Sequence, residues 1–194
     1  MTDFEALYRA DADPWQVASA WYECRKRALL MASLPQQRYG RVLELGCGTG
    51  ITTRELAQRC DDLLAIDSAP TAVSRCRAVL EAAGLGHARV EEGELPRAWP
   101  VTPGATVDLI VVSELAYYFS DADLTAFLDH CHNSLAPGAD WLLCHYKRPF
   151  HDRMQDTDAL HRRAGALPGM RHLIAHDEDD FRLDVWRAAG GSAS

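Results

Sequence analysis

The chain has 194 residues, of which 47% are hydrophobic, and its 28 acidic and 20 basic residues give a formal net charge of -8. This length supports one domain with a full core and leaves no room for a second. The acidic charge disfavours nucleic acid as a partner, because no net field attracts phosphates. The chain has no apolar stretch of about 18 residues and an acidic N-terminus, so we expect neither a membrane span nor a signal peptide. We expect a cytoplasmic monomer or weak dimer.

The six cysteines include no C-x-x-C pair. This usage predicts small buried hydrophobic residues in a reducing compartment. Cys131 lies between His130 and His132, but three consecutive side chains on a helix point in different directions. We therefore expect no metal site.

The first forty residues are predicted to be mostly helical and to precede the sheet. Asp13 and Pro14 are residue types that begin helices, and apolar or aromatic residues recur from Trp15 to Leu29, before Pro35. At the other end of the chain, residues 188–194 are predicted to form a frayed tail.

Between these ends, predicted strands and helices alternate. An apolar stripe at spacings of three and four predicts a helix from Thr71 to Ala83, which Gly84 ends. Ser120 and Asp123 resemble a capping box at the start of another helix. The other predicted elements are helices near 52–60 and 152–164, strands at 41–45, 63–66, 88–91, 107–112, 141–146, 171–175 and 181–187, and a turn at Pro137-Gly138.

This alternation predicts an α/β protein with a Rossmann-like, doubly wound sheet, mostly parallel with one antiparallel edge strand. We expect a single domain over residues 1–194, with a helical lid at 1–40, a core at 41–150, and a C-terminal helix and strand pair at 151–187. In such sheets, ligands bind beyond the carboxyl ends of the strands. The residues predicted at that edge are 44–50, 67–68, 94–95, 113–114 and 145–146.

The segment VLELGCGTG at residues 42–50 is the most informative part of the chain. Its three glycines would let the backbone of a strand-to-helix turn contact a ligand, and the free N–H groups of the helix beginning near Ile51 point the same way. Glu44 interrupts the apolar run, so the strand end faces something polar. Asp67 ends the next apolar run, where such a fold places the acid that binds two ribose hydroxyls. These features predict a cofactor loop, with a tight turn in an unrelated α/β protein as the alternative.

The glycine spacing separates two classes of cofactor. A dinucleotide fingerprint reads G-x-G-x-x-G/A, and its last position falls on Ile51 or Thr53 in the two possible registers. Neither residue allows close packing over a pyrophosphate. The spacing here is E-x-G-x-G-x-G, which resembles the first motif of the class I S-adenosylmethionine-dependent methyltransferases. The resemblance implies S-adenosylmethionine as the cofactor and S-adenosylhomocysteine as the product.

The same resemblance implies roles for individual residues. Gly46, Gly48 and Gly50 would wrap the amino-acid and ribose parts of the cofactor, and Asp67 would bind the ribose hydroxyls. Glu94, with the N–H of Leu95, would meet the adenine amino edge, although Glu94 as a solvated loop acid is an open alternative. The residues expected at the cofactor are Glu44, Gly46, Cys47, Gly48, Thr49, Gly50, Asp67, Ser68, Glu94, Leu95 and Ser113.

Acceptor-facing residues of this family usually follow the fourth strand. Glu114 is our candidate for holding or deprotonating an ammonium acceptor, because a carboxylate attracts the cation and can take its proton. It could instead cap the next helix or contact the loop backbone. Tyr117 and Tyr118 offer a wall and a hydroxyl near a cationic sulfonium, and one of the two is expected to belong to the core.

Further segments resemble the nodulation protein S methyltransferases over roughly residues 4–120, and the resemblance thins afterwards. They are Asp13-Pro-Trp15, Trp21-Tyr-Glu23, Arg25-Lys-Arg27, Leu34-Pro35, Tyr39, Glu44-Leu-Gly-Cys47, Leu56-Ala-Gln-Arg-Cys60, Leu95-Pro96, Trp99-Pro100, Ser113-Glu114 and Tyr117-Tyr118. The resemblance implies N-methylation of the terminal amino sugar of a deacetylated chitooligosaccharide. It also implies that Trp15, Trp21, Tyr22 and Arg25 form a lid, although tryptophans on an amphipathic helix often serve packing. His145, at the end of a later strand, is a further candidate for substrate binding.

Other functions remain open on the sequence alone. The acceptor could be another small amine, or a hydroxyl or thiol. A nicotinamide-dependent oxidoreductase is disfavoured by the glycine spacing and by the lack of room for a substrate domain. A protein that binds S-adenosylmethionine without catalysis is the third alternative.

Overall fold

A computed structural model describes residues 2–190, which form two compact units, 2–94 and 95–190. The seven strands have the order β3-β2-β1-β4-β5-β7-β6. The predicted α/β fold is therefore confirmed, including a mostly parallel sheet with an antiparallel pair at one edge. The prediction of a single domain over the whole chain stays a prediction, and residues 191–194 of the predicted tail lie outside the described residues.

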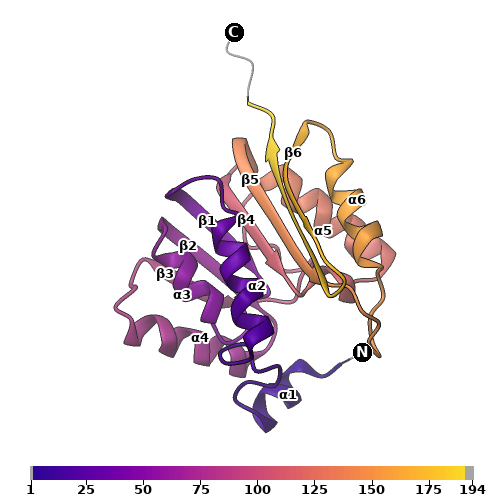
Figure 1. The fold of residues 1–194 in the computed structure, drawn as a ribbon. Helices are drawn as coiled ribbons and strands as arrows, with labels where there is room; N and C mark the ends of the chain where they lie inside the picture. The colour runs from indigo at the N-terminus through magenta and orange to yellow at the C-terminus, as the bar shows by residue number, and fades with distance from the viewer. Residues whose placement is uncertain (1, 191–194) are drawn as a thin grey trace. The chain divides into compact units, whose positions relative to one another are not determined.

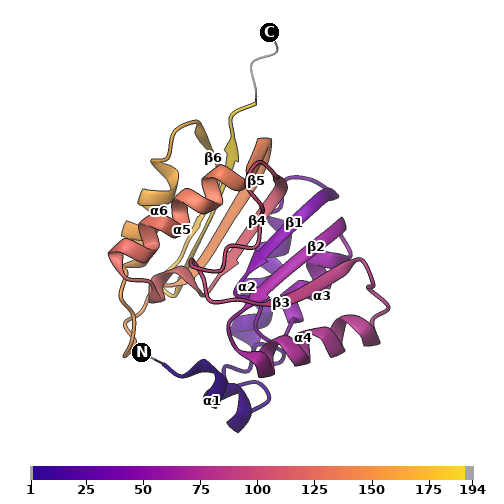
Figure 2. The same cartoon turned by 180° about the vertical axis from the view of Figure 1, so that it is seen from behind.

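The first unit contains four helices and three strands. Its elements are α1 (Phe4–Ala10), α2 (Trp21–Ala32), β1 (Tyr39–Leu45), α3 (Ile51–Ala57), β2 (Cys60–Asp67), α4 (Pro70–Ala82) and β3 (Ala88–Glu92). The strand β2 is parallel to both β1 and β3, and Leu45 lies opposite Ile66. Helix α2 lies in front of β1 and β2 in Figure 1 and behind them in Figure 2. Because β1 and β2 end beside one another, the loop after β1 lies next to the loop after β2.

The second unit carries the antiparallel strands. Its elements are β4 (Val107–Ser113), the 3-10 helix η1 (Ala116–Tyr118), α5 (Asp121–Ser134), β5 (Leu135–Tyr146), α6 (Thr157–Gly165), β6 (Met170–Asp177) and β7 (Phe181–Ala188). The strand β5 is parallel to β4, whereas β7 is antiparallel to both β5 and β6. Helix α5 lies in front of β4 and β5 in Figure 2. The antiparallel strand β7 therefore lies inside the edge strand β6.

The cores of both units come from the apolar runs that the sequence shows. The buried side chains of the first unit include Leu43, Leu45, Leu63, Ile66, Leu56 and Val73, and those of the second include Leu109, Ile110, Trp141, Leu142, Phe127 and Leu183. Five of the six free cysteines are buried and Cys24 is half-buried, as predicted for small hydrophobic residues. Within residues 2–190, no helix is both long and apolar enough to cross a membrane.

The N-terminal region differs from the predicted helix beginning at Asp13. Two helices form, α1 and α2, and the chain between them turns. The carboxylate of Asp13 accepts the N–H groups of Val17 (2.7 Å) and Ala18 (2.9 Å), which closes a turn instead of capping a helix. Gln16 has a φ of 54°, in the left-handed region, and this conformation ends any right-handed helix there.

Two other boundaries were predicted wrongly. The strand β5 begins at Leu135 and runs through the predicted turn at Pro137-Gly138, because a register shift opposite Val107 and Leu109 admits the left-handed Gly138 as a bulge. Helix α6 begins at Thr157 rather than near Asp152, because the Asp156 carboxylate caps it by accepting the Ala159 N–H at 2.9 Å. The predicted capping by Ser120 and the helix end before Gly84 are confirmed.

Candidate active site

The glycine loop joins β1 to α3 and has a backbone that only glycine adopts readily. Gly46, Gly48 and Gly50 have φ values of 81°, 54° and 86°. A side chain at these φ values costs about 1 kcal/mol or more per residue. Glycine is therefore needed at positions 46, 48 and 50 by the backbone conformation of the loop.

The loop is hydrogen-bonded to the end of β2. The N–H groups of Gly46 and Cys47 donate to the carbonyl of Ile66 at 2.8 and 3.0 Å, and the N–H of Gly48 donates to Asp67 Oδ2 at 2.8 Å. These three N–H groups are used within the protein and are therefore not available to a pyrophosphate. That the N–H groups of the helix beginning near Ile51 face a ligand stays a prediction.

Two glycines of the loop are closely approached by neighbouring side chains. A Cβ atom added at Gly50 would lie 2.5 Å from Cys76 Sγ and 2.9 Å from Cys76 Cα, so α4 packs directly against the loop. A Cβ at Gly48 would lie 2.9 Å from the hydroxyl oxygen of Tyr8. Sequence reasoning missed Tyr8, whose only signal was its place beside Leu7 in the short apolar pattern of α1.

Asp67 lies between the loop and α4. Its Oδ2 accepts the Gly48 N–H, and its Oδ1 accepts the Ala69 N–H at 3.0 Å. Burial raises the pKa of Asp67, against the lowering effect of these backbone donors. Each carboxylate oxygen has a second lone pair for a donor such as a sugar hydroxyl. Of the predicted neighbours, Ser68 and Glu94 are exposed, and the Gly93 N–H donates to the Asp67 carbonyl at 3.0 Å.

Glu44 is buried in β1 below the glycine loop, with 4% of its surface exposed. Burial raises its pKa to about 8, against a hydrogen bond with Thr53 that lowers it. Its Oε2 atom has no hydrogen-bond partner among the residues that the structure describes. A buried carboxyl with one unsatisfied oxygen is expensive for a fold, and such groups often mark ligand sites.

The N-terminal segment is fixed to the start of α4. The Glu5 carboxylate accepts both the N–H (2.9 Å) and the hydroxyl (2.7 Å) of Thr71, and Arg75 donates to the carbonyl of Asp11 at 2.9 Å. Trp15 packs against Tyr8 with ring centroids 5.5 Å apart. These contacts hold α1 over the glycine loop.

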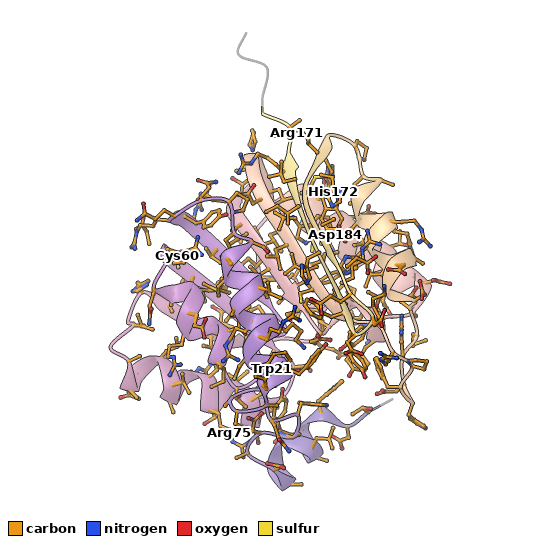
Figure 3. All side chains as sticks on the ribbon, viewed as in Figure 1. Trp21, Cys60, Arg75, Arg171, His172 and Asp184 are labelled. Carbon is orange, nitrogen blue, oxygen red and sulfur yellow. The ribbon has the colours of Figure 1, made fainter. Side chains whose placement is uncertain are left out.

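The other predicted lid residues lie on α2. Trp21 is 76% exposed, and the guanidinium of Arg25 lies 5.8 Å from its ring centroid (Figure 3). Tyr22 is half-buried, with the ammonium of Lys26 4.9 Å from its ring centroid. Trp21 thus offers an exposed ring with the half-buried Arg25 beside it, whereas Tyr22 packs against its own helix.

In the second unit, the end of β4 carries Ser113 and Glu114. Glu114 has a φ of 57°, and its N–H donates to the Cys144 carbonyl at 2.9 Å. Its Oε2 accepts the Tyr117 hydroxyl at 2.5 Å and the Tyr146 N–H at 3.0 Å. The alternative that Glu114 contacts the loop backbone is thus part of the observed geometry, and Ser120, not Glu114, caps α5. The carboxylate is held in one orientation by two donors.

The two tyrosines differ in position. Tyr117 is buried and Tyr118 is half-buried, and their rings meet edge to face at 4.8 Å between centroids. Burial, followed by the charge of Glu114, raises the pKa of Tyr117 well above its usual range. Burial raises the pKa of Tyr118 to about 12. Both hydroxyls keep their protons at neutral pH, so Tyr117 is a donor to Glu114 and not a base.

His145 is fully buried. Its Nε2 lies 3.2 Å from the Ala116 N, and its Nδ1 lies 3.0 Å from His161 Nε2. Both ring nitrogens therefore contact protein, which differs from the expected position at the substrate. Among residues 2–190, no cluster of three His, Cys, Asp or Glu side chains has the arrangement of a metal site.

Comparison with known proteins decides the family. The sequence profile described as "Methyltransferase domain" matches residues 42–138, half of the chain. Nodulation protein S from Sinorhizobium fredii is 30% identical over 179 residues, which cover 90% of this chain and 76% of that protein. The chain belongs to the methyltransferase-domain family. The predicted class I, nodulation-protein-S-like methyltransferase is confirmed.

Other relatives agree. Nodulation protein S from Rhizobium tropici is 31% identical over 128 residues, which cover 65% of this methyltransferase but only 52% of that protein; the chain spans about half the length of that relative. A protein from Pseudomonas syringae described as a methyltransferase is 39% identical, with a TM-score of 0.75 and coverage of 87% of this chain and 99% of that one. N-methyltransferase NodS from Bradyrhizobium japonicum WM9, solved with S-adenosylhomocysteine, shares the fold at 23% identity and a TM-score of 0.75, covering 95% and 97%.

S-adenosylmethionine is the cofactor that the glycine motif predicts. The geometry of the first unit fits this cofactor. The N–H groups of Gly46, Cys47 and Gly48 are used within the protein, which suits an amino acid and a nucleoside more than a pyrophosphate at this part of the loop. Glu44 Oε2 is unpartnered in the strand that leads into the loop, and the Asp67 carboxylate accepts a donor from the loop itself.

Proposed function

We propose that this methyltransferase methylates the nitrogen of an amine, such as the terminal amino sugar of a deacetylated chitooligosaccharide. The observation that carries the proposal is the Glu114 carboxylate, which Tyr117 and Tyr146 hold at the end of β4. Relatives named nodulation protein S, and a structural neighbour named as an N-methyltransferase, support the choice of nitrogen over oxygen or sulfur.

An amine acceptor sets a specific chemical requirement. The bound cofactor supplies a methyl group on a positively charged sulfur that is also the leaving group. An amine is mostly protonated at neutral pH and then has no lone pair. Glu114 attracts the ammonium group and takes its proton, while the donors from Tyr117 and Tyr146 keep the carboxylate in place. Tyr117 and Tyr118 retain their own protons, so Glu114 is our proposed base.

Cofactor binding is assigned to the first unit. We assign the glycine loop with Cys47 and Thr49 to the amino-acid and ribose parts, and Asp67 to the ribose hydroxyls. Glu44 lies buried below the loop and provides its unpartnered oxygen. Ser68 and Glu94 of this unit remain proposed cofactor contacts, as do Leu95 and Ser113 of the second unit.

Acceptor binding is assigned to exposed aromatic surface. Trp21 is the most exposed large aromatic residue described, and Arg25 lies over its ring. Aromatic faces stack on the apolar faces of sugars, and the guanidinium can donate to sugar hydroxyls. Trp15 and Tyr22 support this surface through their contacts on α1 and α2.

The test compares acceptors and the variant Glu114→Gln. We expect wild-type enzyme to transfer labelled methyl groups to glucosamine-terminated chitooligosaccharides, with weaker transfer to N-acetylated ones. In Glu114→Gln the amide keeps the shape and removes the charge, so kcat/KM should fall by roughly 10²-fold, with partial recovery at higher pH where free amine is abundant. Cofactor affinity should be nearly unchanged.

The matched control is Glu81→Gln, which removes an exposed carboxylate on α4 and should keep full activity. Activity on a hydroxyl or thiol acceptor with none on any amine would refute N-methylation. Equal activity of Glu114→Gln and wild type from pH 6 to 9 would remove Glu114 from the mechanism and leave the cofactor assignment intact.

A further inference from the structure

A line of buried polar side chains runs from β7 to the turn after β4. Asp184, His161 and His145 are exposed by 0%, 1% and 0%, although none of them belongs to the proposed chemistry. Asp184 Oδ2 lies 2.7 Å from His161 Nδ1, and His161 Nε2 lies 3.0 Å from His145 Nδ1. His145 Nε2 accepts the N–H of Ala116 at 3.2 Å. Four groups from four elements thus form one continuous chain of hydrogen bonds.

The positions of the ring protons follow from the two ends of this chain. The Ala116 N–H can only donate, so His145 Nε2 is an acceptor and the proton of His145 is on Nδ1. That proton faces His161 Nε2, which must accept it, and the proton of His161 is therefore on Nδ1, facing Asp184. Burial lowers the pKa of His161, so the ring stays neutral. With both rings neutral, a single arrangement satisfies all three bonds.

Asp184 determines which groups donate and which accept in this series of hydrogen bonds. It lies on β7, opposite Leu143 and Ala175 of the adjacent strands, and its carboxylate accepts Arg182 Nε and His172 Nε2, each at 2.6 Å (Figure 3). Burial alone would raise the pKa of Asp184, but the hydrogen bonds of His161 and Arg182 bring it to about 2. The group is thus ionised at neutral pH and can only accept.

The opposite end of the chain supports the turn that carries Glu114. Ala116 lies two residues after Glu114, whose left-handed φ of 57° costs about 1 kcal/mol or more and needs support from its surroundings. The His145 ring also packs edge to face on Tyr117 at 5.2 Å between centroids, and Tyr117 in turn donates to Glu114. Because a backbone amide ends the chain, it cannot carry a proton from Glu114 to Asp184. Its effect on Glu114 is one of orientation.

We propose that Asp184, acting through His161 and His145, is a positioning residue that fixes the His145 tautomer and so holds the Glu114–Tyr117 turn in its active conformation. This inference rests on the proposed function of Glu114. A substitution of His161 tests the proposal most directly, because this ring joins Asp184 to His145. Gln at position 161 can accept from His145 and donate to Asp184, whereas Leu can do neither.

The experiment compares wild type, His161→Leu and His161→Gln by three measurements. Nitrogen-15 NMR of the histidine rings should show both His145 and His161 of the wild type as Nδ1–H tautomers at neutral pH. Hydrogen exchange at the Ala116 amide should be slow in wild type and His161→Gln and faster in His161→Leu. With an amine acceptor, kcat should fall by roughly 10- to 100-fold in His161→Leu, as misplacement of a catalytic group predicts, and recover substantially in His161→Gln. Cofactor affinity and the far-ultraviolet circular dichroism spectrum should be unchanged in all three.

An Nε2–H tautomer of His145 in the wild type would overturn the proposal whatever the activity. So would equal losses of kcat in His161→Leu and His161→Gln, because packing alone would then explain them, or a folded His161→Leu with full kcat. Glu114→Gln in the same assay separates the two proposals. If that variant is fully active, the role of Glu114 fails and the positioning role fails with it, even where the tautomers are as expected.

Discussion

The glycine loop of the first unit and the Glu114 turn of the second unit achieve rigidity in opposite ways. The loop has almost no side chains, and the Ile66 carbonyl and the Asp67 carboxylate on the next strand fix its backbone. The Glu114 turn places one strained residue among large side chains, and a buried histidine chain supports it from β7. The first site therefore combines a motif of nine consecutive residues with the end of the next strand, whereas the second depends on residues up to 70 positions apart in sequence.

The largest expected effect tests whether the loop tolerates any side chain. Gly48→Val adds a branched side chain at a φ of 54°, with its Cβ 2.9 Å from the Tyr8 hydroxyl oxygen. We expect no measurable binding of S-adenosylmethionine by calorimetry, with a native circular dichroism spectrum. Gly86→Val is the control, since nothing lies within 4 Å of a Cβ there and its φ is not left-handed. Normal binding by Gly48→Val would mean that this glycine serves only the turn.

The next largest effect is the pH dependence of stability caused by Glu44, the buried acid below the loop. The folded-state pKa of Glu44, about 8, lies above the ordinary glutamate pKa of 4.5, so the folded protein holds this proton more tightly than the unfolded chain. The free energy of unfolding should therefore decrease as pH rises from about 4.5 to about 8, by about 1.4 kcal/mol per pH unit at most.

Glu44→Gln removes that titration, and its amide mimics the protonated acid. We expect urea unfolding to show a flatter stability profile between pH 5 and pH 8, with the variant more stable than wild type at pH 8. Glu81→Gln, which changes an exposed carboxylate, should keep the wild-type profile. Parallel profiles for wild type and Glu44→Gln would contradict the burial of a neutral acid.

A smaller effect is expected at Asp67, whose role the backbone partly shares. Asp67→Ala should weaken cofactor binding by roughly 1.5–3 kcal/mol, or about 10- to 150-fold in Kd, because charged hydrogen bonds are lost. Asp61→Ala removes an exposed acid on the same strand and should bind normally. Tighter binding of NAD than of S-adenosylmethionine by the wild type would refute the cofactor assignment.

The smallest effect concerns the exposed surface of α2. Trp21→Ala should change the free energy of unfolding by less than about 0.5 kcal/mol, because the side chain is 76% exposed. We expect a higher KM for an oligosaccharide acceptor and an unchanged KM for the cofactor. An unchanged KM for every acceptor would leave Trp21 without a role in acceptor binding.

The contrast between the glycine loop and the Glu114 turn also explains which features the sequence could predict. The glycine turn and the place of Asp67 after the next strand follow from local spacing, and they were predictable in kind, whereas the packing of Cys76 on Gly50 was not. The turn from Asp13 to Ala20 was not, because side-chain to backbone hydrogen bonds outweighed the helical pattern there. Tyr8, His161 and Asp184 were missed because their partners lie far away in sequence.

The position of Tyr8 has a consequence for turnover. Any molecule that rests on Gly48 must share that surface with the Tyr8 hydroxyl or displace it. Helix α1, which carries Tyr8, is attached to α4 through Glu5 and Thr71, and the following segment through Arg75. We therefore expect substitutions that break these contacts to change the rate of product release, with the loop itself unaltered.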